Sequence, residues 1–267
     1  MEMLVLIKGA GDLASGVALR LHRSGFDVVM TDIANPTSIR RTVCFSEAIR
    51  LGETMVEDVK ARRADSVKEA FEIIKAGEIP VIADENCECR KELKPDAMVD
   101  AIIAKRNINT TINDAPIVVA LGPGFTAGVD CHAVIETQRG HNLGRVILSG
   151  SAAPNTGIPG IIGGVGADRV LRAPCEGIFE PINKIGDIVC AGDTVATVNG
   201  EPMKTKIDGV LRGLLPQGVP VFGGMKSGDV DPRGNVQNCY TVSDKASAIA
   251  GGTLEAILRL SGIMKKL

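Results

Sequence analysis

A glycine-rich turn close to the start of the chain, within LVLIKGAGDLASGVALRLHRSGFDVVMTD, constrains the fold more than any other feature. The apolar run before it is continuous, which is typical of a buried parallel strand. After it, apolar side chains recur every fourth residue, which predicts a helix with one face on a sheet. Another apolar run, Val28–Met30, predicts a second strand, and Asp32 follows at its carboxyl end. The segment therefore predicts a parallel βαβ unit.

The turn fits the pattern G-x-G-x-x-[G/A] of dinucleotide-binding folds. Gly9 permits a tight turn, Gly11 lets a phosphate approach the backbone, and Ala14 keeps the helix close to the strand. The first amides of a helix and the helix dipole favour an anion. Asp32 is placed to accept hydrogen bonds from a ribose. We therefore predict a cofactor site at Gly9, Ala10, Gly11, Asp12, Leu13, Ala14 and Asp32.

The alternative for this segment is a fold of the same type whose site is degenerate and empty. Asp12 lies inside the turn, where its carboxylate would repel a pyrophosphate unless it caps the helix instead. Lys8, directly before Gly9, is the other unusual residue of the turn. Both alternatives stay open at the level of the sequence.

Strand and helix signals alternate through the first half of the chain. Ser66 and Glu69 form a capping box at the start of a helix. Apolar runs predict further strands at 79–83, 98–104 and 115–121. This alternation predicts a Rossmann-like, doubly wound parallel sheet of the α/β class. Because such sheets bind ligands beyond the carboxyl ends of their strands, we expect Asp32, Asp84 and Lys105 at one edge.

A second glycine-rich loop, GPGFTAG, follows the strand predicted at 115–121. Its amides could cradle an anion, and a tight turn is an equally good interpretation. We include Gly122 and Gly124 in the predicted cofactor site. Chemically capable side chains follow closely, which suggests the mouth of a site. They are Asp130, His132, Glu136, Arg139, His141 and Arg145.

The seven cysteines are scattered, and no export signal precedes the first strand, so we predict reduced thiols and a cytoplasmic protein. Cys87 and Cys89 form a C-x-C pair with no second pair elsewhere. An ordinary loop is therefore favoured over a metal site, and no metal is predicted. Arg40 and Arg41 could contact a cofactor phosphate, and a solvated basic edge explains them equally well.

Composition excludes several classes of partner. The net charge is −2 and aromatic residues make up 3% of the chain, so we predict no nucleic-acid partner. No apolar run approaches the roughly 20 residues of a membrane span, so we predict no membrane partner. Self-association into a homo-oligomer is left open.

A quasi-repeat occupies the region after residue 170. Four positions of the first half recur in the second with an offset of 32 residues: Gly177, Gly186, Val189 and Gly192 match Gly209, Gly218, Val221 and Gly224. Short strands broken by glycine turns predict two interlocked β-units in a small barrel or sandwich. The region resembles biotinyl and lipoyl carrier domains, but the predicted hairpin tip, Asn199-Gly200, carries no Lys. We predict no biotin or lipoate.

These signals predict three regions. A Rossmann-like α/β domain spans 1–170, and a barrel-sandwich-like β domain spans 171–235. A helix at 236–267 returns to the α/β domain. Gly251 and Gly252 inside that helix predict close backbone packing, because each glycine otherwise costs roughly 1 kcal/mol relative to Ala.

Several blocks together resemble one family, the YqeB-type proteins of the selenium-dependent molybdenum hydroxylase system. They are KGAGDLASGVA, IRRTVCFSEA, VDAIIAKRN, ALGPGFTAGVDCHAVIETQRGHNLGRVI, NTGIPG and GGMKSGDVDPRG. The resemblance spans nearly the whole chain. It implies an accessory protein for the maturation of molybdenum-containing hydroxylases, with such an enzyme as partner. It assigns no catalytic residues.

Three functional hypotheses follow. The first is an accessory factor that binds a small nucleotide-bearing ligand, either NAD(P) or a molybdopterin dinucleotide, since both carry a pyrophosphate. The second is an NAD(P)-dependent oxidoreductase, whose proton donor would be His132, His141 or Lys105. The third is a sulfur- or selenium-handling thiol enzyme that uses Cys131.

Overall fold

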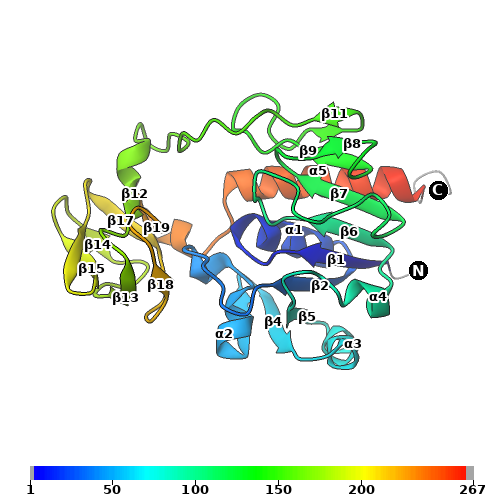
Figure 1. The fold of residues 1–267 in the computed structure, drawn as a ribbon, viewed down its shortest axis with the longest axis horizontal. Coiled ribbons are helices and arrows are strands. Elements are labelled where there is room, and N and C mark those ends of the chain that lie inside the picture. Colours follow the sequence, from blue (N-terminus) through cyan, green and yellow to red (C-terminus); the bar gives the residue numbers. More distant parts are fainter. Residues whose placement is uncertain (1–2, 263–267) are drawn as a thin grey trace. The chain divides into compact units, whose positions relative to one another are not determined.

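The computed structural model describes residues 3–262, and their contacts divide them into two compact units (Figure 1). The first unit contains the chain up to Pro36, then Cys44–Asn155, and the chain from Val242 onward. The second contains Thr37–Val43 and Thr156–Thr241. Thr37–Val43 thus packs with a part of the chain that lies far away in sequence.

A nine-stranded sheet forms the centre of the first unit, in the order β10-β9-β7-β6-β1-β2-β5-β4-β3. Neighbouring strands are parallel except for β3–β4 and β9–β10 at the two edges. The strands are β1 (Leu4–Lys8), β2 (Asp27–Asp32), β3 (Glu53–Val56), β4 (Val59–Ala64), β5 (Ile79–Ala83), β6 (Ala97–Asp100), β7 (Ile117–Leu121), β9 (Ala133–Ile135) and β10 (Val146–Ile147). Two short strands, β8 (Thr126–Ala127) and β11 (Gly150–Ser151), pair separately.

The strand order reverses direction beside β1. From β1 the chain builds β2, β4 and β5 on one side, and then places β6, β7 and β9 on the other. In doubly wound sheets such a switch point opens a crevice beyond the carboxyl ends of the strands. The glycine turn after β1 lies at this switch point.

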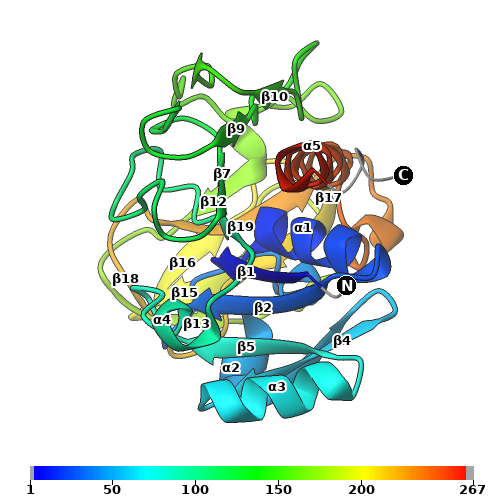
Figure 2. The same ribbon diagram turned by 90° about the vertical axis from the view of Figure 1, so that its right-hand side faces the viewer.

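Helices cover both faces of the sheet. α1 (Asp12–Arg23) and α5 (Asp244–Ser261) lie side by side, as Figure 2 shows in blue and red. Their axes approach closely, because a Cβ on Gly16 would lie 2.8 Å from the Cβ of Ala246. α3 (Val67–Lys75) packs against Leu6 and Val29 from the opposite face. The remaining helices are α2 (Glu47–Leu51) and α4 (Arg90–Leu93).

The capping box predicted at α3 forms with one difference. The Ser66 hydroxyl accepts a hydrogen bond from the Glu69 amide at 3.2 Å, as predicted. The Glu69 carboxylate reaches back to the amide of Asp65, one residue earlier than the pattern requires. Both ends of the motif therefore hold the first turn of the helix.

The second unit consists of two four-stranded antiparallel sheets, β12-β19-β17-β14 and β16-β15-β13-β18. A shift of 32 residues maps β12–β15 onto β16–β19 and converts the first order into the second, so the two halves interlock. The two sheets enclose one core that contains Phe179, Leu211 and Val230. The strands are β12 (Val170–Arg172), β13 (Gly177–Pro181), β14 (Ile188–Val189), β15 (Thr194–Val198), β16 (Glu201–Lys204), β17 (Gly209–Leu214), β18 (Pro220–Val221) and β19 (Lys226–Asp231).

The predicted hairpin tip is present in this unit. Asn199 and Gly200 have φ angles of 50° and 83°, as a type I′ turn requires, and they join β15 to β16. Short 3₁₀ helices complete the unit at Arg41–Val43, Ala167–Arg169 and Val236–Cys239.

The structure confirms the predicted class at the level of its sheets: a mixed α/β protein with a large, mostly parallel sheet, further antiparallel sheets and a C-terminal helix. The helix begins at Asp244, and residues 263–267 of the predicted segment lie outside the described residues. Among the helices between residues 3 and 262, none has the length and apolar character needed to cross a membrane.

Candidate functional site

The turn between β1 and α1 is held tightly by the chain on both sides. The Gly9 amide continues the sheet by donating to the Thr31 carbonyl at 2.8 Å. Gly9 has φ of 103°, and a Cβ there would lie 3.1 Å from the carbonyl group of Ala101. Glycine is therefore required here both by the backbone angle and by the close approach of the chain after β6.

Asp32 braces this turn. One carboxylate oxygen accepts a hydrogen bond from the Ala10 amide and the other accepts one from the Ile33 amide, each at 2.8 Å. Burial raises the pKa of Asp32, and these two backbone hydrogen bonds oppose that rise. The side chain predicted to bind a ribose thus already fixes the shape of the glycine turn.

Ser15 and Ser46, which belong to no predicted site, complete the frame of the turn. The Ala10 carbonyl accepts hydrogen bonds from the Ser46 amide at 2.9 Å and from the Ser15 hydroxyl at 3.1 Å. The Ser15 hydroxyl in turn accepts one from the Phe45 amide at 2.8 Å. In the sequence, the only signal for this frame is that Ser15 directly follows Ala14, the last position of the glycine motif.

The start of α1 lacks a side-chain cap. Gly11 is the N-cap residue, with an extended backbone at φ −76° and ψ −170° and no side-chain cap. Within residues 3–262, no hydrogen-bond acceptor reaches the amides of Leu13 and Ala14. Gly11, Asp12 and Leu13 are partly exposed. Amides at this end of a helix favour an anionic ligand, with the Asp12 carboxylate as an opposing charge.

The second glycine loop is built for packing. The Gly122 amide donates to the Ile135 carbonyl at 2.9 Å, so this amide is taken by the sheet. A Cβ on Gly124 would lie 2.5 Å from the α-carbon of Arg106, at a φ of 106°. Close contact with residues 106–107 accounts for the glycine at 124, so the geometry favours the tight turn over the anion cradle.

The polar residues that follow mostly hold backbone. Asp130 accepts a hydrogen bond from the Thr126 amide, and Glu136 accepts from the amides of Gln138 and Ala153. His132 accepts from the Val118 amide at 3.0 Å through Nδ1. Arg139 pairs with Asp244, whereas His141 and Arg145 are exposed. These contacts account for Asp130 and Glu136 without a ligand.

Cys131 is fully buried. Burial, followed by the nearby Asp130 carboxylate, raises the pKa of its thiol to about 12. A nucleophilic cysteine needs the opposite shift, because the thiolate is the reactive form. The predicted thiol chemistry therefore has no support at this position.

A buried polar cluster lies at the carboxyl ends of β1 and β6. Lys8 is 2% exposed, and its Nζ lies 3.1 Å from the Thr110 hydroxyl and 3.8 Å from an Asp100 oxygen. Nζ also donates to Asn109, and the Thr110 hydroxyl donates to Asp100 at 2.6 Å. Asp84, predicted at the same edge, accepts the Cys89 amide at 2.8 Å, while Lys105 is exposed. Lys8 thus places a positive charge inside the sheet edge.

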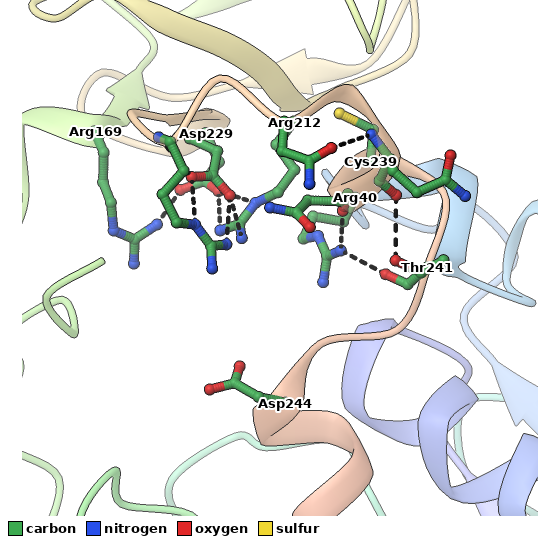
Figure 3. A network of polar contacts seen from close by, with 12 residues as sticks. Arg40, Arg169, Arg212, Asp229, Cys239, Thr241 and Asp244 are labelled. Atoms are coloured by element: carbon green, nitrogen blue, oxygen red, sulfur yellow. Dashed lines mark hydrogen bonds and ion pairs between the residues drawn. The ribbon is translucent and has the colours of Figure 1, made fainter. Parts of the chain in front are cut away.

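Arg40 and Arg41 both donate hydrogen bonds to backbone carbonyls, and the burial of Arg40 contradicts a solvated edge at that residue. Arg40 is 7% exposed and donates to the carbonyls of Asn238 and Thr241 at 3.0 and 3.2 Å (Figure 3). Arg41 donates to the Leu214 carbonyl at 2.8 Å. Both side chains hold Thr37–Val43 against the rest of the second unit.

The GDVDPR block forms an ion-pair network inside the second unit, part of which Figure 3 shows. Asp229 pairs with both Arg169 and Arg212, and Arg212 also reaches Asp231 at 3.1 Å. Arg233, at 2.6 Å, is the further partner of Asp231. The interior of the β unit therefore accounts for Asp229 and Asp231, whereas Arg233 pairs with Asp231 from an exposed position.

Comparison with known proteins gives one strong match. No model of a known protein family matches the chain. The chain is 53% identical over 259 residues, 97% of its length, to the uncharacterized protein YqeB of Escherichia coli strain K12. This similarity supports the YqeB-type resemblance. The chain spans about half the length of this curated relative, 48%.

Solved structures give weak matches. A succinylglutamate desuccinylase/aspartoacylase from Rhodobacter sphaeroides is 28% identical over 24% of this chain and 22% of that chain, with a TM-score of 0.21. An aspartoacylase family protein from Mesorhizobium loti is 12% identical over 86% of this chain and 84% of that chain, with a TM-score of 0.27. Scores of this size give no basis for transferring fold or function.

Proposed function

We propose that the first unit is a Rossmann-like domain that binds a nucleotide-bearing ligand through the glycine turn after β1. The observation that carries the proposal is the position of this turn. It lies at the switch point of the strand order, and the amides of Leu13 and Ala14 have no acceptor in the described part of the chain. A diphosphate is the group that such a helix start receives in doubly wound folds.

NAD(P) and a molybdopterin dinucleotide are the two ligands that fit this proposal, because both present a diphosphate. Asp32 would hold the turn in shape rather than act only on a ribose, since both of its oxygens accept backbone amides. The setting that we propose is maturation of molybdenum-containing hydroxylases, with such an enzyme as partner. The family resemblance of the sequence blocks and the YqeB match support this setting.

Mass spectrometry of ligands that copurify with the chain, followed by calorimetric titration with NAD⁺, NADP⁺ and a molybdopterin dinucleotide, tests the proposal. The decisive variant is Gly11→Val. The backbone of Gly11 is extended, a conformation that valine adopts readily, and we expect the added side chain to crowd a diphosphate bound at the turn. We expect affinity to fall about tenfold or more, a loss of about 1.4 kcal/mol or more, with an unchanged unfolding midpoint.

Gly223→Val is the matched control. Gly223 is exposed in the second unit, and a Cβ there makes only an ordinary contact, 3.7 Å from Cys175. This variant should bind as the parent protein does. Equal affinity of the parent and the Gly11 variant for every ligand would show that the nucleotide binds elsewhere or not at all.

A further inference from the structure

A hollow of about 730 Å³ lies at the edge of the nine-stranded sheet opposite the glycine turn. It is lined by α4, by the turns that lead into β6 and β7, and by the residue that precedes β9. Figure 1 shows α4 at the end of the sheet where β1 begins. Three cationic side chains, two carboxylates, an imidazole and an amide line the hollow among apolar residues. Its volume is in the range of small-molecule sites, roughly 300–1,000 Å³.

The two carboxylates of the hollow already hold groups of the protein itself. Asp114, whose side chain is 10% exposed, accepts the Thr111 amide through one oxygen at 2.9 Å. Its other oxygen lies 3.3 Å from Nε of Arg90. Asp96 accepts the amide of Leu4, the first residue of β1, at 2.9 Å. Three of the four carboxylate oxygens are therefore used to build the frame of the hollow, which disfavours a cationic ligand.

Arg90 is held in place by this frame and keeps one group for a ligand. Its Nη1 donates to the Cys87 carbonyl at 2.9 Å, and its Nε pairs with Asp114. The side chain is 22% exposed. Within residues 3–262, no acceptor lies within hydrogen-bond distance of Nη2. The guanidinium is thus oriented before any ligand arrives, and a fixed charged donor of this kind favours an oxyanion.

His132 contributes a second N–H donor. The Val118 amide donates to its Nδ1 at 3.0 Å, and its own amide donates to the Val118 carbonyl at 2.8 Å. Because a backbone amide can only donate, Nδ1 carries no proton, and the proton of the neutral ring is on Nε2. The partly buried ring lines the hollow, and no residue of the described chain accepts a hydrogen bond from Nε2.

Lys94 is the third donor. It caps the C-terminal end of α4 with φ of 48° and ψ of 60°, in the left-handed region that non-glycine residues rarely adopt. Backbone strain of this kind is concentrated at functional sites. The side chain is exposed, and among the residues that the structure describes no carboxylate pairs with it. The neighbouring Lys91, by contrast, pairs with Glu88.

We propose that this hollow is a second ligand site, which binds a small metabolite through a phosphate or carboxylate group. Arg90, His132 and Lys94 donate to the oxyanion, and the donors outnumber the acceptors that the frame leaves unused. Ile112 and Pro116 give the hollow an apolar wall for the rest of the molecule. Because the site lies at the opposite edge of the sheet, it does not depend on what the glycine turn binds.

Two-dimensional amide NMR of the full chain tests the site with two probes, inorganic phosphate and succinate, and with chloride at matched ionic strength. We expect saturable shifts of the amides of Asn113, Asp114 and His132 with at least one probe, and none with chloride. Saturation by phosphate alone assigns the site to phosphorylated ligands, and saturation by succinate alone assigns it to carboxylates. Shifts that fail to saturate at these amides, or that chloride reproduces, would overturn the proposal.

Two variants each remove one donor and spare the frame. In His132→Asn, the amide oxygen takes the position of Nδ1 and can still accept the Val118 amide, whereas the Nε2 donor is lost. In Lys94→Asn, the new residue adopts the left-handed backbone more readily than lysine does, so a loss of binding cannot be attributed to unfolding. We expect each variant to bind the probe about tenfold more weakly, with an unfolding midpoint no lower than that of the parent protein.

Lys105→Asn is the matched control. Lys105 is also an exposed lysine in the left-handed region, with φ of 63°, but it follows β6 at the other edge of the sheet. This variant should bind the probe as the parent protein does. If it lost affinity while the His132 and Lys94 variants kept theirs, the anion would bind at the carboxyl edge and the assignment would be wrong. Parental affinity in all three variants would contradict it equally.

Discussion

Gly252 in α5 packs directly against the carbonyl oxygen of Gly144: a Cβ at position 252 would lie 2.0 Å from that oxygen. The neighbouring Gly251 meets nothing within 4 Å. The close packing predicted for the glycine pair is therefore confirmed at Gly252 alone. Close packing therefore offsets the free-energy cost of a helical glycine at position 252, whereas nothing offsets it at position 251.

This difference predicts opposite effects of one substitution at adjacent residues. Gly252→Ala should destabilise the protein by about 2 kcal/mol or more, because backbone must move to admit the methyl group. Gly251→Ala should stabilise it by about 0.5–1 kcal/mol, because alanine loses less backbone entropy in a helix. Denaturant unfolding monitored by circular dichroism measures both. Equal effects of the two substitutions would contradict the packing described for α5.

A second prediction concerns the ion pairs inside the β unit. Asp229→Asn should cost about 3–5 kcal/mol, because Arg169 and Arg212 would keep their charges in a buried site without their shared carboxylate. The control is Asp168→Asn, which removes a pair with Lys206 whose side chains are 63% and 68% exposed. Exposed pairs contribute at most about 1 kcal/mol. If the two substitutions lowered the free energy of unfolding equally, the buried network would contribute no more than a surface ion pair.

A third prediction concerns acid. Burial alone would raise the pKa of Asp231, but hydrogen bonds from Arg233 and the charge of Arg212 bring it below the ordinary value of 3.8. Because the folded pKa is depressed, this carboxylate stabilises the fold above the unfolded pKa, and the contribution disappears as pH falls through the folded pKa. The free energy of unfolding should therefore decrease with acidification below about pH 4, and Asp231→Asn should make that decrease shallower. An unchanged slope in the variant would assign the acid sensitivity to other groups.

The sequence predicted what depends on local pattern. The strand, glycine turn and helix around Gly9 follow from periodicity, and the two β sheets of the second unit follow from the 32-residue offset. Each of these signals is contained in one short stretch or in its repetition.

Contacts between residues far apart in the sequence could not be predicted from the local sequence pattern. Arg40 stands 198 positions from Asn238, and nothing near it indicates that its guanidinium is buried against that carbonyl. No local signal indicated that the Asp32 carboxylate accepts the amide of Ala10, 22 positions earlier, and its contact with a ribose stays a prediction.

The last prediction distinguishes the cysteines by their surroundings. Cys131 should resist iodoacetamide in the native protein between about pH 6 and about pH 9, because burial and Asp130 raise its pKa to about 12 and because no reagent reaches it. Cys190 is exposed and should be modified far faster than Cys131 at the same pH. Peptide mass spectrometry after timed alkylation measures both rates, and unfolding the protein in denaturant should make the two equal. Selective labelling of Cys131 at pH 6 in the folded chain would instead restore the nucleophile that its burial excludes.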